Sequence, residues 1–349
     1  MRGSLLAYGW DYNRGCIRDD DFANNMRQSE KIYIAGHRGL AGSAILRHLQ
    51  SLGYENIVTR THDELDLTRK DSVADFFATE KPDYVFLAAA RVGGILANNT
   101  YPAEFILSNL EIQTNVIHEA WKAGVKRLLF LGSSCIYPRA CPQPMKEEYL
   151  LTGPLEATNR PYAIAKIAGI EMCWAYNRQH GTRFLAAMPT NLYGPGDNYD
   201  LQNSHVLPAL IRKIHEAKEQ GNAEVVVWGT GTPRREFLHA DDMAAACAFL
   251  MSLTNDRFDV LVHSETSAPL INIGCGEDQS IRELAETVSQ VVGYEGRLRY
   301  DVSKPDGTPR KLLDVGRLNM LGWRYGIGIQ DGIARTYRSF LDSIANASG

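Results

Sequence analysis

The chain has 349 residues, 44% of them hydrophobic and 22% charged, and its formal net charge is −4. At about 150 residues per domain, this length predicts two domains, and the ordinary apolar content excludes a wholly disordered chain. The small negative charge argues against a nucleic-acid partner. No apolar run approaches the ~20 residues of a membrane-spanning helix, so no membrane association is expected.

The six cysteines are sparse, and no two of them form a CxxC pair. This pattern indicates neither a zinc ribbon nor a disulfide framework. We therefore expect no metal site and a cytoplasmic location, where thiols stay reduced.

Residues 1–30 differ from the sequence that follows them. They contain no long apolar stretch, so a cleaved secretory signal is not expected, and two early arginines mixed with acidic residues make a poor transit peptide. We interpret this segment as a poorly ordered tail. A short docking arm carrying Trp10 and Tyr12 is the alternative interpretation.

From Lys31 onward, short apolar runs alternate with amphipathic stretches, which is typical of βαβ units and a parallel sheet. Strands are predicted at 31–35, 56–60, 83–90, 127–134 and 183–194, and helices at 43–53, 71–82, 108–125 and 160–181. After a turn-rich connector, a series of helix, strand, helix, strand and helix is predicted at 205–221, 224–231, 238–253, 269–275 and 280–294.

This order predicts an α/β fold with two domains. A Rossmann-type doubly wound parallel sheet is expected over residues 31–192, and later elements return to it at about 237–273. The remaining segments, about 193–236 and 274–349, are expected to form a smaller α/β substrate-binding domain.

A glycine motif, Gly36-x-x-Gly39-x-x-Gly42, falls between the first predicted strand and the first predicted helix. In that context glycines let the backbone turn sharply and approach a pyrophosphate, whose charge is met by the helix N-terminus. The motif therefore predicts a dinucleotide cofactor.

The residues near the end of the second strand favour NADP(H) over NAD(H). An NAD site places an acidic side chain there, on the ribose 2′-hydroxyl, but this chain has Arg60 and His62 in that region. Arg38 lies inside the glycine loop, and positive groups at both places suit a 2′-phosphate. Asp66 and Leu67 begin the stretch that would flank the adenine.

Tyr162 and Lys166 are four residues apart on a predicted helix, so both side chains face one site. A lysine ammonium beside a phenol lowers the pKa of the phenol, and such a tyrosine can donate a proton to a carbonyl that receives hydride. Lys166 could also hold the nicotinamide ribose. Ser133, at the end of an earlier strand, would hydrogen-bond the substrate oxygen.

This combination resembles the extended short-chain dehydrogenase/reductase superfamily from about residue 31 to 345. Seven segments, taken in order, are similar more narrowly to the GDP-L-fucose synthase family: 91–105, 130–138, 160–166, 189–200, 203–213, 225–244 and 303–315. The resemblance implies epimerisation at C3 and C5 of GDP-4-keto-6-deoxy-D-mannose, followed by NADPH-dependent reduction at C4.

The resemblance also implies roles for individual residues. Inversion needs one group to remove a proton and another to return it from the opposite face, and the family supplies a cysteine and a histidine with pKa values near neutrality. By resemblance, Cys135 is the epimerisation base and His205 the acid. Further cofactor contacts are implied for Leu40, Pro189, Asn191, Leu192 and His205, and substrate contacts for Lys213, Trp228, Arg235 and Lys304.

The chain departs from the family pattern at three positions. Lys213 stands where the family often has arginine, His62 stands where some members have a second arginine, and Arg234 beside Arg235 leaves the phosphate contact ambiguous by one residue. Members of the superfamily also pair two long helices in a homodimer, which here would be 108–125 and 160–181.

Two alternative functions stay open. A related nucleotide-sugar enzyme, such as a colitose-type synthase, is hard to separate by sequence, although Cys135-Ile136 after the serines argues against a dehydratase, which would have Asp-Glu there. A non-catalytic NADP-binding sensor is the second alternative. Such proteins typically lose the tyrosine or the lysine, whereas Tyr162 and Lys166 are both present.

Overall fold

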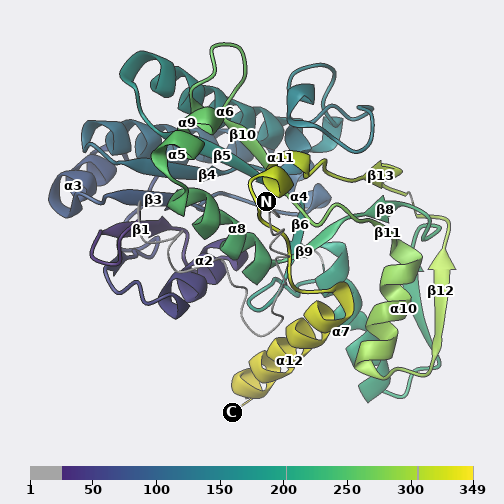
Figure 1. The fold of residues 1–349 in the computed structure, drawn as a ribbon. Coiled ribbons are helices and arrows are strands. Elements are labelled where there is room, and N and C mark those ends of the chain that lie inside the picture. The colour runs from purple at the N-terminus through teal and green to yellow at the C-terminus, as the bar shows by residue number, and fades with distance from the viewer. Residues whose placement is uncertain (1–25, 202, 305, 349) are drawn as a thin grey trace, which may run out of the picture.

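A six-stranded parallel sheet forms the centre of the molecule (Figure 1). The computed structural model describes residues 26–201, 203–304 and 306–348. The strand order is β10-β5-β4-β3-β1-β2, so the winding reverses between β1 and β3, which confirms the predicted doubly wound α/β class. The strands are β1 (Ile32–Ala35), β2 (Ile57–Val58), β3 (Tyr84–Leu87), β4 (Arg127–Leu131), β5 (Phe184–Pro189) and β10 (Leu270–Ile273).

Helices cover both faces of this sheet (Figure 1). One face packs against α2 (Leu40–Ser51) and α8 (Ala240–Ser252). The other packs against α3 (Lys70–Glu80), α5 (Pro102–Lys122) and α6 (Arg160–His180). Sheets covered in this way have strands that are apolar on both faces, which is why the sequence shows continuous apolar runs here.

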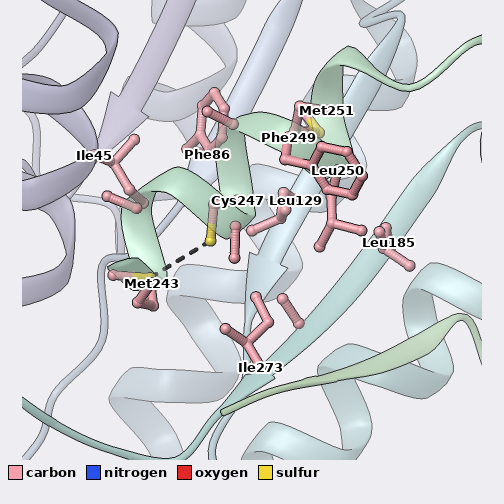
Figure 2. Packing of buried hydrophobic residues seen from close by; sticks show 14 of the residues in the cluster. Ile45, Phe86, Leu129, Leu185, Met243, Cys247, Phe249, Leu250, Met251 and Ile273 are labelled. Atoms are coloured by element: carbon pink, nitrogen blue, oxygen red, sulfur yellow. Dashed lines mark hydrogen bonds between the residues drawn. The ribbon is translucent and has the colours of Figure 1, made fainter. Parts of the chain in front are cut away.

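Alternate residues of each strand enter the two different cores, as the two-residue period of a strand requires. In β1, Ile32 and Ile34 pack on the α2–α8 side, whereas Tyr33 and Ala35 pack on the opposite side. Figure 2 shows α8 against the sheet, with Met243 near Ile45 of α2. The thiol of Cys247 lies 3.5 Å from the sulfur of Met243 one turn earlier, so this cysteine serves as a core residue.

A third apolar core supports the smaller part of the molecule. Its helices are α7 (Val206–Glu219), α10 (Ile281–Val292) and α12 (Ile329–Ser348). Strands β7 (Glu224–Trp228) and β12 (Arg297–Asp301) form a parallel pair, and β11 (Gln279–Ser280), β8 (Arg234–Arg235) and β13 (Arg310–Lys311) form a three-stranded sheet. A second parallel pair, β6 (Asn191–Tyr193) with β9 (Phe237–His239), joins the two parts.

Several short or shifted elements differ from the sequence prediction. The predicted strand 183–194 divides into β5 and β6, because the chain leaves the central sheet after Pro189 and pairs with β9 instead. Helix α5 begins at Pro102 rather than 108, and proline at the first helical turn is a recognised start. The unpredicted short helices are α4 (Ile95–Thr100), α9 (Asn255–Val262), α11 (Gly316–Met320), η1 (Ser134–Ile136), η2 (Glu147–Tyr149) and η3 (Ala157–Asn159).

The predicted tail ends earlier than expected. Residues 1–25, with Trp10 and Tyr12, lie outside the described residues, but residues 26–30 belong to the nucleotide-binding part. Met26 is buried in the α2–α8 core and its carbonyl accepts a 2.6 Å hydrogen bond from the Tyr54 hydroxyl. Glu30 forms an ion pair with Lys126. Assigning 26–30 to a poorly ordered tail is therefore wrong. Within the described ranges, no helix has the length and apolarity that crossing a bilayer requires.

Candidate active site

The glycine loop between β1 and α2 forms a cradle that side chains would fill. Gly36 has a φ of +87°, and a Cβ there would lie 2.7 Å from the backbone nitrogen of Ala89; a Cβ on Gly42 would lie 2.1 Å from the Gly36 carbonyl oxygen. Gly39 is the N-cap of α2, and in this fully described helix no side chain caps that end. The first amides of α2 are therefore free to meet a pyrophosphate, and the cradle fits the predicted dinucleotide. Leu40, predicted to contact the cofactor, also packs against the core.

The two arginines expected at a 2′-phosphate have different surroundings. Arg60 forms a 2.5 Å ion pair with Glu80, and its guanidinium lies over the Phe76 ring. Arg38 is exposed, and among the described residues it has neither an ion pair nor a hydrogen bond. Arg38 is therefore the cation better placed for an incoming phosphate.

The loop predicted to flank the adenine is fixed by its own hydrogen bonds. The carboxylate of Asp66 accepts from the Thr68 amide at 3.0 Å and from the Thr68 hydroxyl at 2.7 Å. The side-chain amide of Asn115 donates to the Leu67 carbonyl at 2.9 Å. His62 lies 3.9 Å from Asp66. This loop therefore has a defined backbone beside the glycine cradle.

The predicted catalytic residues meet where β4 ends and α6 begins. Ser133 caps the short helix η1, and its Oγ accepts a 3.5 Å hydrogen bond from the Cys135 amide. Lys166 donates to the Leu131 carbonyl at 2.8 Å, and its Nζ lies 5.8 Å from the centre of the Tyr162 ring. Strand β4 and helix α6 thus place one serine, one thiol, one phenol and one ammonium around a common point.

Burial dominates the protonation of these groups. It raises the pKa of Tyr162, which a hydrogen bond with Ser133 offsets in part, and it lowers the pKa of Lys166 to about 8. The expectation that Lys166 lowers the pKa of Tyr162 is therefore not met, because desolvation of the phenol outweighs other effects and the ammonium is directed at Leu131. Tyr162 is held as a neutral proton donor.

Cys135 lies in a pocket that it shares with a lysine the sequence analysis missed. Burial raises the pKa of the Cys135 thiol, whereas the nearby charges of Lys311 and Lys166 lower it. Cys135, Gln143 and Lys311 line this pocket together. The two cations supply the positive charge that a thiolate would need in a buried position.

His205 occupies a different place from the other four predicted catalytic residues. It precedes α7 as its N-cap and is exposed, yet the protein around the imidazole still lowers its pKa by desolvation. In the described part of the chain, no hydrogen bond joins His205 to Cys135. The carbonyl of Asn203 lies 3.4 Å from the Cβ position of Gly94, so the segment before His205 adjoins the loop that follows β3.

The residues after β5 have structural contacts of their own. Pro189 ends β5, and Leu192 packs against the α2–α8 core. The side-chain amide of Asn191 donates to the Glu236 carbonyl at 2.8 Å. Their positions at the carboxyl end of the sheet stay compatible with the predicted cofactor contacts.

Two of the predicted substrate residues, Lys213 and Lys304, lie against a third, Trp228. This indole is 64% exposed, and the ammonium groups of Lys213 and Lys304 lie 5.0 Å and 5.6 Å from its ring centre. Arg235 is part-buried, which lowers its pKa, and its guanidinium donates to the Arg234 carbonyl. No ion pair involves Lys213, Arg235 or Lys304 among the residues that the structure describes.

Lys311 extends this cationic group toward Cys135. Strand β13 pairs with β8 in parallel, which sets Lys311 opposite Arg235 in the register. Two neighbouring cations without a carboxylate in ion-pair range in the described chain favour an anionic ligand such as a diphosphate. The sequence signal that could have identified Lys311 is the basic pair Arg310-Lys311 in segment 303–315. Strand β13 is too short for a periodic pattern to mark it.

Within the described residues, no group of three or more His, Cys, Asp and Glu could hold a metal ion.

A family model described as the NAD dependent epimerase/dehydratase family matches residues 32–260. GDP-L-fucose synthase 1 of Arabidopsis thaliana is 59% identical over 319 residues, covering 91% of this chain and 95% of that protein. GDP-L-fucose synthase of Escherichia coli is 56% identical over 314 residues, covering 90% and 97%. GDP-L-colitose synthase of Yersinia pseudotuberculosis is less similar, at 38% identity over 318 residues, with 90% and 99% covered.

A solved structure agrees over the same length. The GDP-mannoheptose C4 reductase of Campylobacter jejuni, a structure with NADP bound, superposes with a TM-score of 0.83 at 43% identity, covering 90% of this chain and 99% of that one. The likeness includes both the sheet and the smaller part of the molecule.

Proposed function

The chain belongs to the NAD-dependent epimerase/dehydratase family, and from that premise we propose that it converts GDP-4-keto-6-deoxy-D-mannose to GDP-L-fucose by epimerisation and reduction. The relatives of highest identity named above carry the name GDP-L-fucose synthase. One observation carries the proposal: the thiol of Cys135 is set two residues from Ser133, beside Tyr162 and Lys166. A plain reductase needs no second proton-transfer group in that place.

Epimerisation uses the acidity that the C4 ketone gives to the neighbouring C–H bonds. The Cys135 thiolate removes a proton at C3 or C5, and an enolate forms on the sugar. His205 returns a proton to the opposite face, which inverts the centre. Burial opposes the thiolate, and the charges of Lys311 and Lys166 counter that effect.

Reduction uses the residues on α6 and at the end of β4. NADPH, when bound, supplies the hydride for C4. Tyr162 donates its proton to the C4 oxygen, Ser133 hydrogen-bonds the same oxygen, and Lys166 holds the nicotinamide ribose. The glycine cradle holds the pyrophosphate, and Arg38 holds the 2′-phosphate. Asp66, Leu67 and the residues after β5 lie along the rest of the cofactor.

The GDP part of the substrate binds to the second half of the site. Trp228 stacks on the guanine or the ribose, because its exposed ring offers a flat apolar surface. Lys213, Lys304 and Arg235 neutralise the diphosphate. None of the three has an acidic partner within ion-pair distance in the described chain, which supports this assignment.

Incubation with GDP-4-keto-6-deoxy-D-mannose and NADPH, with product identification by NMR, tests the proposal. Inversion at C3 and C5 together with reduction at C4 is the expected result. Reduction without inversion would indicate a plain C4 reductase, and binding without turnover would indicate a sensor. Parallel assay of the 3-deoxy keto sugar tests the colitose alternative, which the lower identity of the colitose synthase disfavours.

We also propose a homodimer formed through α5 and α6. Leu107 on α5 and Ile164 on α6 are apolar side chains that are 57% and 43% exposed, and Trp121 stacks on His180 between the same helices, with ring centres 4.2 Å apart. Light scattering should give twice the chain mass for the wild type and a monomer for Ile164→Glu. A wild-type monomer would contradict this interface.

A reducing compartment such as the cytoplasm would keep Cys135 a thiol.

A further inference from the structure

The segment that carries Lys311 is held between the two halves of the site. On one side it runs beside the residues that follow the catalytic serine and cysteine. The Met145 amide donates to the Leu312 carbonyl at 2.7 Å, and the Asp314 amide donates to the Met145 carbonyl at 2.8 Å. On the other side, β13 pairs with β8, which carries Arg235. The position of Lys311 therefore depends on both neighbours.

Two side chains accept hydrogen bonds from consecutive backbone amides of this segment. Oε1 of Gln143 accepts from the Leu312 amide at 2.8 Å, and Oε2 of Glu236 accepts from the Leu313 amide at 2.9 Å. The other oxygen of Glu236 accepts from the Gly276 amide at 2.7 Å. We call Gln143 and Glu236 the clamp.

The carboxylate of Glu236 lies in an unusual environment, because the residue is 0% exposed. The surrounding chain closes tightly on it: a Cβ on Gly274 would lie 2.2 Å from its Oε1. No cation lies within ion-pair distance of Glu236 in the described chain. Burial raises the pKa of this carboxyl group, and hydrogen bonds from backbone amides and from the Thr190 side chain counter that effect. A buried charge of this kind costs stability unless it is fully hydrogen-bonded, which suggests that its retention serves more than packing.

The carboxylate connects three parts of the molecule. Glu236 itself follows Arg235 directly, so strand alternation sends the Arg235 side chain toward the cationic group and the Glu236 side chain into the interior. Gly276 follows β10 of the central sheet, and Leu313 follows Lys311 by two residues. One side chain thus ties the central sheet to both strands that present the cations.

We propose that Glu236, assisted by Gln143, is a positioning residue for the diphosphate site: the clamp fixes Lys311 beside Arg235 so that both cations meet one anion. This inference rests on the proposed function, which supplies the GDP diphosphate. Glutamate is needed because both oxygens accept from amides. A glutamine would turn an N–H toward one of those amides and release either Leu313 or Gly276.

Glu236→Gln tests the clamp through two binding constants measured on the full chain by calorimetry. We expect the Kd for GDP to rise about tenfold, as the loss of one buried hydrogen bond predicts, and the Kd for NADPH to change by less than twofold. Asp242→Asn is the matched control. It is the same change from acid to amide at a buried side chain whose two oxygens also accept from backbone amides, those of Gly326 and Ile327. This control should leave the Kd for GDP unchanged.

Gln143→Met gives a second measurement that does not depend on how well Glu236→Gln folds, since Gln143 is only half-buried. It should weaken GDP binding about fivefold and spare NADPH. An unchanged Kd for GDP in either variant, or equal losses for GDP and NADPH, would overturn the positioning role. A wild-type chain that fails to bind GDP would instead refute the proposed function, and this inference with it.

Discussion

The two halves of the site are built in different ways. On the nucleotide side, the cradle is backbone: Gly36 and Gly42 approach other main-chain atoms so closely that a Cβ would collide with them. On the substrate side, Lys213, Trp228 and Lys304 come from separate elements and meet through their side chains. The first half is fixed by the path of the chain, and the second by how distant segments pack.

This difference predicts different tolerance to substitution. A backbone cradle fails abruptly, because any side chain there displaces main-chain atoms. A group of cationic side chains loses affinity in steps, since each contributes separately to one anion. Helix α6 packs on the central sheet and carries Tyr162, the proposed proton donor.

Tyr162→Phe should have the largest effect. Removal of the proton donor should lower NADPH oxidation by roughly a thousandfold, while deuterium exchange at C3 and C5 in D2O persists because Cys135 is untouched. Cys135→Ser is the reciprocal control, which should lose exchange yet bind NADPH. Loss of both activities in Tyr162→Phe would contradict the separation of reduction from epimerisation.

Gly42→Ala should break the backbone half. Its Cβ would lie 2.1 Å from the Gly36 carbonyl oxygen, whereas Gly328, before α12, has nothing within 4 Å of its Cβ position. We expect Gly42→Ala to weaken NADPH binding by about a hundredfold, because relief of that collision costs ~1–3 kcal/mol. Gly328→Ala should bind NADPH normally. Fluorescence titration of both variants makes the comparison, and equal affinities would disprove the cradle.

The same difference explains what could be predicted from the sequence. The glycine loop and the Tyr162–Lys166 pair each occupy one contiguous stretch, so their spacing, together with the predicted strands and helices around them, was enough to single them out as candidates. Lys311 was missed because β13 has two residues and its neighbour Arg235 is distant in sequence. The direction of the Tyr162 pKa shift was also wrong, since desolvation depends on the whole fold.

The pH dependence of reduction tests the role of Lys166 on α6. Because burial lowers the pKa of Lys166 to about 8, its charge is lost above that pH, and kcat should fall about tenfold between pH 8 and 9.5. The unfolded chain keeps this proton to higher pH, so the contribution of Lys166 to the free energy of unfolding rises over the same range. A fall in kcat without a matching fall in Tm supports Lys166. A flat profile would exclude it.

Trp228→Leu should produce a graded loss on the substrate side. Without the indole, stacking and the contacts with Lys213 and Lys304 disappear, and the KM for the GDP-sugar should rise about tenfold. The KM for NADPH should stay the same. Trp174→Leu is a control on the nucleotide side, where this indole donates to the Ser264 carbonyl. A rise for NADPH as large as that for the sugar would remove Trp228 from the substrate half.

The smallest effect should separate the two arginines near the 2′-phosphate. Arg60 is already engaged by Glu80 at 2.5 Å, so its charge is partly neutralised before any ligand arrives. Arg38→Ala should therefore raise the KM for NADPH about fivefold, as one exposed charge-assisted contact predicts, and leave the KM for NADH unchanged. Arg60→Ala should shift the ratio of the two KM values by less than twofold. A larger shift for Arg60 would mean that the 2′-phosphate displaces Glu80 from Arg60. The Arg60–Glu80 ion pair would then not persist when NADPH is bound.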